Sequence, residues 1–171
     1  DCSFCTTDPS ILNINKKNKI FFIPNPLDPS LDNLKIFNNI FFENDVFFAM
    51  SHGVHRGTLK RGKLDKREVF IKKLIKKTPG IKFDIYGVDN KQPVWAEKFK
   101  ETLSKSKMAI NLSQGSSSKY YSSDRIAQLM GNGVLTFIDR KTKLNHFFKN
   151  NEAIFYNSIN DLSKKIYFFS K

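Results

Sequence analysis

The sequence predicts an α/β domain in which a parallel sheet lies between layers of helices. From about residue 45 onward, apolar runs of strand length alternate with longer segments whose apolar residues recur every three or four positions. Strands that alternate with helices are joined by right-handed crossovers, and such crossovers produce a parallel sheet. The 171 residues are enough for one domain of this kind with a sizeable core.

The first predicted strand covers residues 46–50, an unbroken apolar run typical of a strand buried on both faces. A helix is predicted over 65–77 with Val69, Phe70 and Leu74 facing inward, and a proline-glycine pair ends it. The remaining predicted elements are strands over 81–86, 107–112, 134–138 and 153–156, and helices over 95–104, 143–149 and 160–169.

The most informative stretch covers residues 120–139, where a polar loop, a short helix, a glycine turn and a buried strand follow one another. Ile126 and Leu129 share the buried face of this helix, whereas Arg125 and Gln128 share another face. Two serine hydroxyls and a basic side chain therefore flank an open helix N-terminus, and one of the serines is expected to cap the helix. Such a geometry is suited to binding phosphate.

Residues 1–44 lack the regular alternation. A short apolar run over 19–23 is stopped by the proline-rich stretch 24–29, because proline lacks an amide donor and fixes its backbone angle. Cys2 and Cys5 have no second cysteine pair with which to complete a zinc site, so we expect ordinary thiols in or near a strand. No apolar run approaches the roughly 18 residues needed to span a bilayer.

The net charge of +13 is the strongest bulk property of the chain. It indicates anionic partners, which could be nucleic acid, anionic lipid or phosphorylated substrates. A composition rich in Lys, Asn, Ile and Phe also explains the charge without any functional demand. The lysines of the helix over 65–77 are expected to form a solvated face. Together with Lys60, Arg61 and Lys63 they could also dock on an anionic membrane.

Three polar loops follow predicted strands, over residues 51–62, 87–93 and 113–123. In a parallel sheet, ligands bind beyond the carboxyl ends of the strands, which is the edge where these loops would meet. The first loop combines glycines with cations, and the third combines hydroxyls with an amide and a cation. Their convergence predicts a single ligand site at this edge.

Five words in the chain match one known family in order and approximate spacing. They are Phe-Asp-Ile-Tyr-Gly at 83–87, Trp95, Ala-Ile-Asn-Leu-Ser at 109–113, Ser-Asp-Arg-Ile at 123–126 and Gln-Leu-Met-Gly-Asn-Gly at 128–133. Together they resemble the donor-binding half of GT-B glycosyltransferases, in particular the group-1-like, CgeB-like branch. The resemblance implies a Rossmann-like parallel sheet sandwiched by helices, as the C-terminal half of a GT-B fold. A complete GT-B enzyme has two such domains, so this chain would be one part of it.

The resemblance also implies a division of the chain and a set of donor contacts. Residues 1–44 would form an N-terminal segment with the interdomain crossing, and residues 45–171 the nucleotide-sugar donor-binding domain. The implied phosphate-binding residues are Arg56, Arg61, Ser122, Ser123 and Arg125, with Lys60 and Arg67 in reserve. The implied ribose- or sugar-binding residues are Ser113, Gln114, Tyr121 and Gln128, and those near the base are Gly87 and Trp95. No catalytic residue is assigned.

The implied activity is transfer of a sugar from a nucleotide-sugar to a glycan or lipid-linked acceptor, in the synthesis of glycans or lipopolysaccharide-type surface polysaccharide. The chain has no Asp-x-Asp word, which fits metal-independent GT-B enzymes, so no metal or other cofactor is expected. A cytoplasmic location is implied, with peripheral contact at the inner face of the membrane. Many retaining members have glutamate where this chain has Gln128. An amide can still hydrogen-bond a diol, but it does so without the full negative charge of a carboxylate.

Several features have other interpretations. A non-catalytic nucleotide-sugar-binding scaffold is one alternative to the enzyme, and a basic nucleic-acid-binding module is another, although the cations are spread along the chain without a binding motif. His52 and His55 make a weak metal site and are expected to be exposed or bonded to backbone. The glycine-asparagine-glycine turn at 131–133 is expected to be a helix C-cap, and Trp95 to pack in the core.

Overall fold

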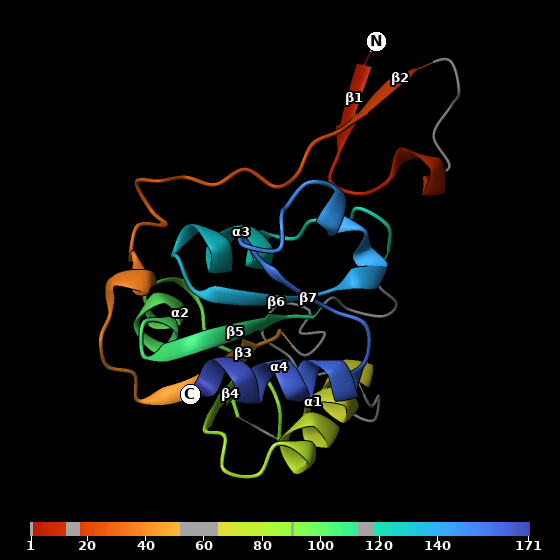
Figure 1. The fold of residues 1–171 in the computed structure, drawn as a ribbon. Coiled ribbons are helices and arrows are strands. Elements are labelled where there is room, and N and C mark those ends of the chain that lie inside the picture. The colour runs from red at the N-terminus through yellow and green to blue at the C-terminus, as the bar shows by residue number, and fades with distance from the viewer. Residues whose placement is uncertain (1, 13–17, 52–64, 90, 113–117) are drawn as a thin grey trace.

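A five-stranded parallel sheet forms the centre of the molecule in the computed structural model, which describes residues 2–12, 18–51, 65–89, 91–112 and 118–171 (Figure 1). Across the sheet, the strands are β4 (Phe83–Tyr86), β3 (Asn44–Ala49), β5 (Ser106–Asn111), β6 (Leu135–Asp139) and β7 (Ile154–Tyr156). The chain begins the sheet at β3, adds β4 on one side and then continues from β5 on the other. The order of the strands therefore reverses between β3 and β5, which is where open parallel sheets bind their ligands.

Helices cover both faces of the sheet (Figure 1). α1 (Lys66–Lys77) and α4 (Ile159–Ser170) pack on one face, and α2 (Ala96–Leu103) and α3 (Asp124–Gly131) pack on the other. The predicted Rossmann-like sandwich is confirmed.

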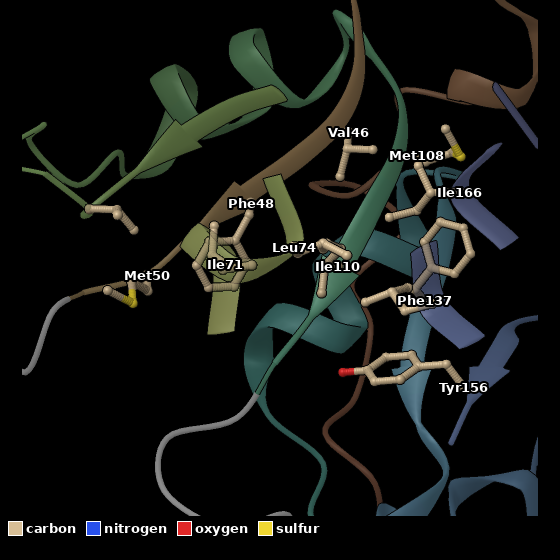
Figure 2. Close-up of a cluster of buried hydrophobic side chains, with 12 residues drawn as sticks. Val46, Phe48, Met50, Ile71, Leu74, Met108, Ile110, Phe137, Tyr156 and Ile166 are labelled. Carbon is tan, nitrogen blue, oxygen red and sulfur yellow. The ribbon is translucent and has the colours of Figure 1, made fainter. Parts of the chain in front are cut away.

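The core has two layers because β3 is buried on both faces. Val46 and Phe48 face α1 and α4, whereas Phe47 and Ala49 face α2 and α3. Figure 2 shows the first layer, in which Ile71 of α1 lies against Phe48 of β3. This two-sided burial explains the unbroken apolar run at 46–50, since alternation is lost when neither face meets water.

The other predicted elements are present within a few residues, with one exception. The predicted helix over 143–149 is wrong, since 3₁₀ turns η3 (Arg140–Thr142) and η4 (Leu144–His146) take its place. Lys143 between them is left-handed with φ of 57°, a conformation that an α-helix cannot include. On α1, Val69 is only half-buried, because Arg67 and Glu68 occupy the buried positions of the first turn.

The N-terminal residues form a separate unit beside the main sheet (Figure 1). β1 (Cys2–Cys5) and β2 (Lys19–Phe22) pair in parallel, and a 3₁₀ turn η1 (Pro9–Ile11) lies between them. Both cysteines therefore lie in a strand, as predicted. The unit is attached to the loop before α3, since the Ser122 amide donates to the Thr6 carbonyl at 2.8 Å. Among the described residues, no helix is long and apolar enough to cross a membrane.

Residues 23–43 connect this unit to β3 and run along α3, with one 3₁₀ turn, η2 (Ile36–Asn38). At the N-terminal end of α3, the Asn25 amide donates to Ser122 Oγ at 3.1 Å. At the C-terminal end, the buried Asn132 side chain accepts from the Leu34 amide at 3.2 Å, and the Asn132 carbonyl accepts from the Ile36 amide at 2.9 Å. The predicted C-cap at 131–133 is thus confirmed, and this connecting segment holds α3 at both ends.

Candidate functional site

A cavity of about 420 Å³ opens at the carboxyl end of β3, at the point where the strand order reverses. Its volume lies in the range of small-ligand pockets. One wall is polar and is formed by Arg67, Tyr121, Ser123, Asp124, Arg125 and Gln128. The other is largely apolar and is formed by Met50, Val94, Trp95 and Phe99. The walls come from the segments after β3, β4 and β5. Of the three predicted loops, the first contributes Ser51 and the third Tyr121 and Ser123, whereas the second is represented only by Val94 and Trp95, just beyond its predicted end.

The N-terminus of α3 opens into this cavity. Ser123 is the N-cap residue, but its hydroxyl makes no capping bond, and Ser123 Oγ is buried without a hydrogen-bond partner. Among the described residues, the amides of Asp124 and Arg125 also have no acceptor. The partial positive charge of a helix N-terminus and unsatisfied donors together favour an anion at this position. Asp124 opposes it with an acid, whose carboxylate accepts from the Asn25 side-chain amide.

Arg125 projects from the first turn of α3 into the polar wall. Its Nη1 donates to the Leu112 carbonyl at 2.7 Å, and its guanidinium carbon lies 5.8 Å from the centre of the Phe48 ring. Burial, and then the nearby charge of Arg67, lower the pKa of Arg125 to about 10. The side chain therefore stays charged at neutral pH. No carboxylate among the described residues lies within ion-pair distance of it, and a half-buried cation in this state is stabilised by an anionic ligand.

Arg67 supplies the second cation of the polar wall. It lies in the first turn of α1 and is held by Asp65, the N-cap of that helix, through Nη2–Oδ2 at 2.7 Å and Nε–Oδ1 at 3.1 Å. Asp65 Oδ1 also accepts from the Arg67 amide at 2.8 Å. This fork fixes the guanidinium plane, and the buried Arg67 forms part of the cavity wall.

A family model described as glycosyl transferase-like matches residues 66–171, more than half of the chain. The chain belongs to the glycosyl transferase-like family. No curated protein and no solved structure gave a match. The match and the parallel sheet are consistent with the C-terminal domain of a GT-B glycosyltransferase, so the predicted resemblance is confirmed at the level of the family.

The matched region contains most of the cavity of this glycosyltransferase-like domain. Tyr121, Gln128 and Trp95 line it with Ser123 and Arg125, so the structure brings together five of the residues predicted from the sequence. Ser122 and Gly87 do not line it. Ser122 is buried, and its hydroxyl accepts from Asn25. Gly87 has φ of +75°, and a side chain there would collide with the Met50 carbonyl. The backbone at this position therefore requires glycine.

Trp95 is not a core residue, contrary to the prediction. Its side chain is 60% exposed and forms part of the apolar wall, because Trp95 is the N-cap of α2 and its backbone is extended there. Ala96, the next residue, has φ of 46°, which is uncommon for a residue with a side chain. The chain thus turns sharply at this point and leaves the indole at the mouth of the cavity.

Several predicted residues lie outside the described residues, namely Arg56, Arg61, Lys60, Ser113, Gln114, His52 and His55. Of the reserve residues, Arg67 alone is described, and it lies in the cavity wall. The sequence also offers a local signal for Arg67, since Asp65 lies two residues earlier at the predicted helix start, a spacing that allows an N-cap acid to hold an arginine. The apolar wall left no signal, since Val94 and Phe99 read as ordinary core residues.

The arrangement suits electrostatic rather than redox or nucleophilic chemistry. Two guanidiniums, a free hydroxyl and a helix N-terminus all favour negative charge at one wall of the cavity. In the described part of the chain, no group of three histidine, cysteine or acidic side chains could hold a metal ion. Such a wall favours the binding of a negatively charged group.

Proposed function

We propose that this chain is the donor-binding domain of a GT-B glycosyltransferase that uses a nucleotide-sugar. One observation carries the proposal, which is the pairing of Arg67 and Arg125 beside the open N-terminus of α3. The charge of Arg125, buried beside Arg67, is costly in the free protein, and a diphosphate with its two or more negative charges offsets that cost. A monoanionic ligand would offset only part of it.

The walls of the cavity suggest how the donor lies. The diphosphate would contact Ser123, the first amides of α3 and the two arginines. The ribose or sugar would lie along Gln128 and Tyr121, which offer an amide and a hydroxyl to a diol. The base would stack on the exposed face of Trp95. As the glycosidic bond breaks, negative charge grows on the departing nucleoside diphosphate, and the arginines and helix amides stabilise it.

In this proposal, Arg67 and Arg125 do the work that a donor-bound metal does in other transferases, so the reaction needs no metal. The acceptor, a glycan or a lipid-linked sugar of a surface polysaccharide, would enter from the cavity mouth. The catalytic base would be supplied from outside the described residues. The CgeB-like branch and a cytoplasmic location are part of the same proposal.

A titration of intrinsic fluorescence tests the proposal, because Trp95 is the single tryptophan of the chain and lines the cavity. We expect one of the UDP-, GDP-, ADP- or CMP-sugars to quench this fluorescence with saturation. Arg125→Ala should weaken that affinity at least about tenfold, or 1.4 kcal/mol, and Arg125→Lys should weaken it less, because the charge remains without the fork. Lys141→Ala is the matched control, since Lys141 is an exposed cation at the same edge outside the cavity.

Unchanged affinity in Arg125→Ala, or equal loss in Lys141→Ala, would reject the assignment of the phosphate site. For the scaffold alternative, the amide of Gln128 in place of a carboxylate is the supporting observation.

A further inference from the structure

Large apolar side chains are exposed at the edge of the sheet opposite the cavity. The strands begin at this edge, and the connection that leads into β3 passes along it. Ile40 is fully exposed there, and the neighbouring Phe41 is 79% exposed. Phe168, near the end of α4, is 72% exposed. Adjacent exposed apolar residues of this size mark an interaction site more often than ordinary surface.

These side chains are held in place rather than carried on a loose segment. On one side of Ile40 and Phe41, the Asn39 side-chain amide donates to the Ser104 carbonyl at 3.2 Å. On the other side, the amides of Glu43 and Asn44 both donate to the Lys105 carbonyl at 3.0 Å. The tip between these anchors is therefore presented in a fixed position, and its exposure is a property of the fold.

Phe168 belongs to the same edge. Lys107 Nζ donates to the Ser170 carbonyl at 3.3 Å, which places the end of α4 beside the start of β5. Figure 1 shows the C-terminus next to the chain that enters β3. The Phe168 ring stands edge-on to Phe169 with centroids 4.9 Å apart, and Phe169 in turn contacts the core, so the exposed ring rests on a rigid base.

Exposed cations lie at the same edge of the sheet as the apolar side chains. Lys77 at the end of α1, Lys82 before β4 and Lys171 after α4 are exposed. None of the three has an ion-pair partner in the described part of the chain. The nearest acid on the tip, Glu43, faces Lys105 at 3.8 Å. We define the amino-edge patch as Ile40, Phe41, Phe168, Lys77, Lys82 and Lys171.

We propose that the amino-edge patch docks this protein on an anionic lipid bilayer. Apolar side chains on a fixed tip enter the boundary between headgroups and acyl chains, while flanking lysines meet anionic headgroups. Docking in this way leaves the cavity open. α1 and α4 both run from the carboxyl edge to the amino edge, and a helix of 12 residues spans about 18 Å. The cavity would thus face away from the membrane surface.

Two other occupants fit the patch less well. Single-stranded nucleic acid is bound by aromatic faces in a basic groove, whereas the tip of this patch includes the aliphatic Ile40. A second copy of the chain would form a two-fold contact that brings the three lysines of each copy together, while the tip acid Glu43 already faces Lys105 of its own chain.

Flotation with lipid vesicles tests the proposal without any nucleotide-sugar, so its outcome is separate from that of the proposed function. We expect the protein to bind vesicles of phosphatidylcholine with about 30% phosphatidylglycerol, and to bind pure phosphatidylcholine far more weakly. Lys77→Glu with Lys171→Glu should reduce partitioning by at least about 25-fold, because each lysine near an anionic surface contributes roughly fivefold. Ile40→Ser with Phe41→Ser should leave residual binding that is abolished by moderate salt.

Matched controls come from the opposite edge. Lys141→Glu with Lys149→Glu makes the same change of net charge, and Ile11→Ser removes another exposed apolar side chain. As a direct readout, Phe41→Trp in a Trp95→Phe background should show a blue-shifted emission on anionic vesicles, whereas Ile11→Trp in that background should not.

Three results would overturn the proposal. The first is equal loss of binding in the control variants, and the second is no spectral shift at position 41. The third is a change of oligomeric state or of RNA binding in Ile40→Ser/Phe41→Ser, with vesicle binding unchanged.

Discussion

Residues around the cavity are costly for the free protein. Arg125 carries a half-buried charge beside Arg67, Ser123 Oγ is buried without a partner, and Ala96 occupies a left-handed conformation. Each of these features destabilises the unliganded state, and an anionic ligand would compensate the first two. Destabilising residues that cluster around one cavity are typical of a binding site rather than of a structural core.

Gly87 offers the clearest stability prediction at this scale. Gly87→Ala should lower the free energy of unfolding by about 3 kcal/mol or more, because the new Cβ would collide with the Met50 carbonyl in addition to the strain of a left-handed backbone. Gly80→Ala is the control, since Gly80 is also left-handed, with φ of +86°, but no atom lies within 4 Å of its Cβ position. Urea denaturation should therefore show a loss of only about 1–2 kcal/mol there. Equal losses in the two variants would contradict the close approach of β4 to β3.

At the scale of elements, α3 depends on the segment that precedes the sheet. Its N-terminal loop is held by Asn25, and its C-cap residue Asn132 is bonded to Asp32, Leu34 and Ile36. The helix that carries Arg125 and Gln128 is thus positioned by residues about 100 positions away in the sequence. This dependence links the orientation of the polar wall to the connecting segment.

Asn132→Ala should destabilise the protein by about 3 kcal/mol. The substitution removes two donated bonds of Asn132 Nδ2, to Asp32 Oδ1 and the Gln128 carbonyl at 2.8 Å each, and leaves the Leu34 amide without its acceptor. Asn39→Ala, which removes a single exposed bond to Ser104, should cost less than about 1 kcal/mol. Chemical denaturation measures both. A loss in Asn132→Ala no larger than that in Asn39→Ala would show that the connecting segment does not hold α3.

The attachment of the β1–β2 unit should depend on pH. Hydrogen bonds from Lys119 and then from Ser10 lower the pKa of Asp8 to about 2. A carboxyl group whose pKa is lowered by folding stabilises the folded state above its unfolded pKa, near 3.8, and this stabilisation is lost as the pH falls from about 4 towards 2. The protection factor of the Ser122 amide, which bonds to Thr6, should fall over that range and should already be low in Asp8→Asn at neutral pH.

Asp28→Asn provides the control for this experiment, because hydrogen bonds from Ser30 lower the pKa of Asp28 within a local turn. Its substitution should leave the Ser122 amide protected. Protection that persists in Asp8→Asn would mean that other contacts, such as the stacking of Phe22 on Phe147, attach the unit by themselves.

The sequence predicted what local pattern controls and missed what distant contacts control. The run at 46–50 and the face shared by Arg125 and Gln128 depend on spacing within one element, and both were predicted correctly. The exposure of Trp95 depends on the sharp turn at Ala96, and the 3₁₀ turns after β6 depend on the left-handed Lys143. Neither turn contains a glycine that would have signalled it. The parallel pairing of β1 with β2 is likewise a contact between segments that no periodicity reveals.

At the scale of the whole molecule, the two edges of the sheet have different characters. The carboxyl edge contains the cavity and its cations, while the amino edge contains the fixed apolar tip with exposed lysines. Two groups of the chain's cations therefore lie on surfaces with different proposed partners, a nucleotide diphosphate and an anionic bilayer. Separating them by the length of a helix allows both to be engaged at once.

The connecting segment should belong to the same cooperative unit as the sheet, even though the resemblance places the domain boundary at residue 45. Ile36 is 1% exposed and packs with Leu129 and Val134 in the core between the sheet and α2 and α3. A chain that begins at residue 25 should melt within a few degrees of the full chain, because it keeps Ile36 and its bond to Asn132. A chain that begins at residue 45 should lose about 3–5 kcal/mol or fail to fold cooperatively, since removal of Ile36 uncovers Leu129. Thermal and urea denaturation of both chains decide this, and equal stability would show that the folding unit starts at β3 itself.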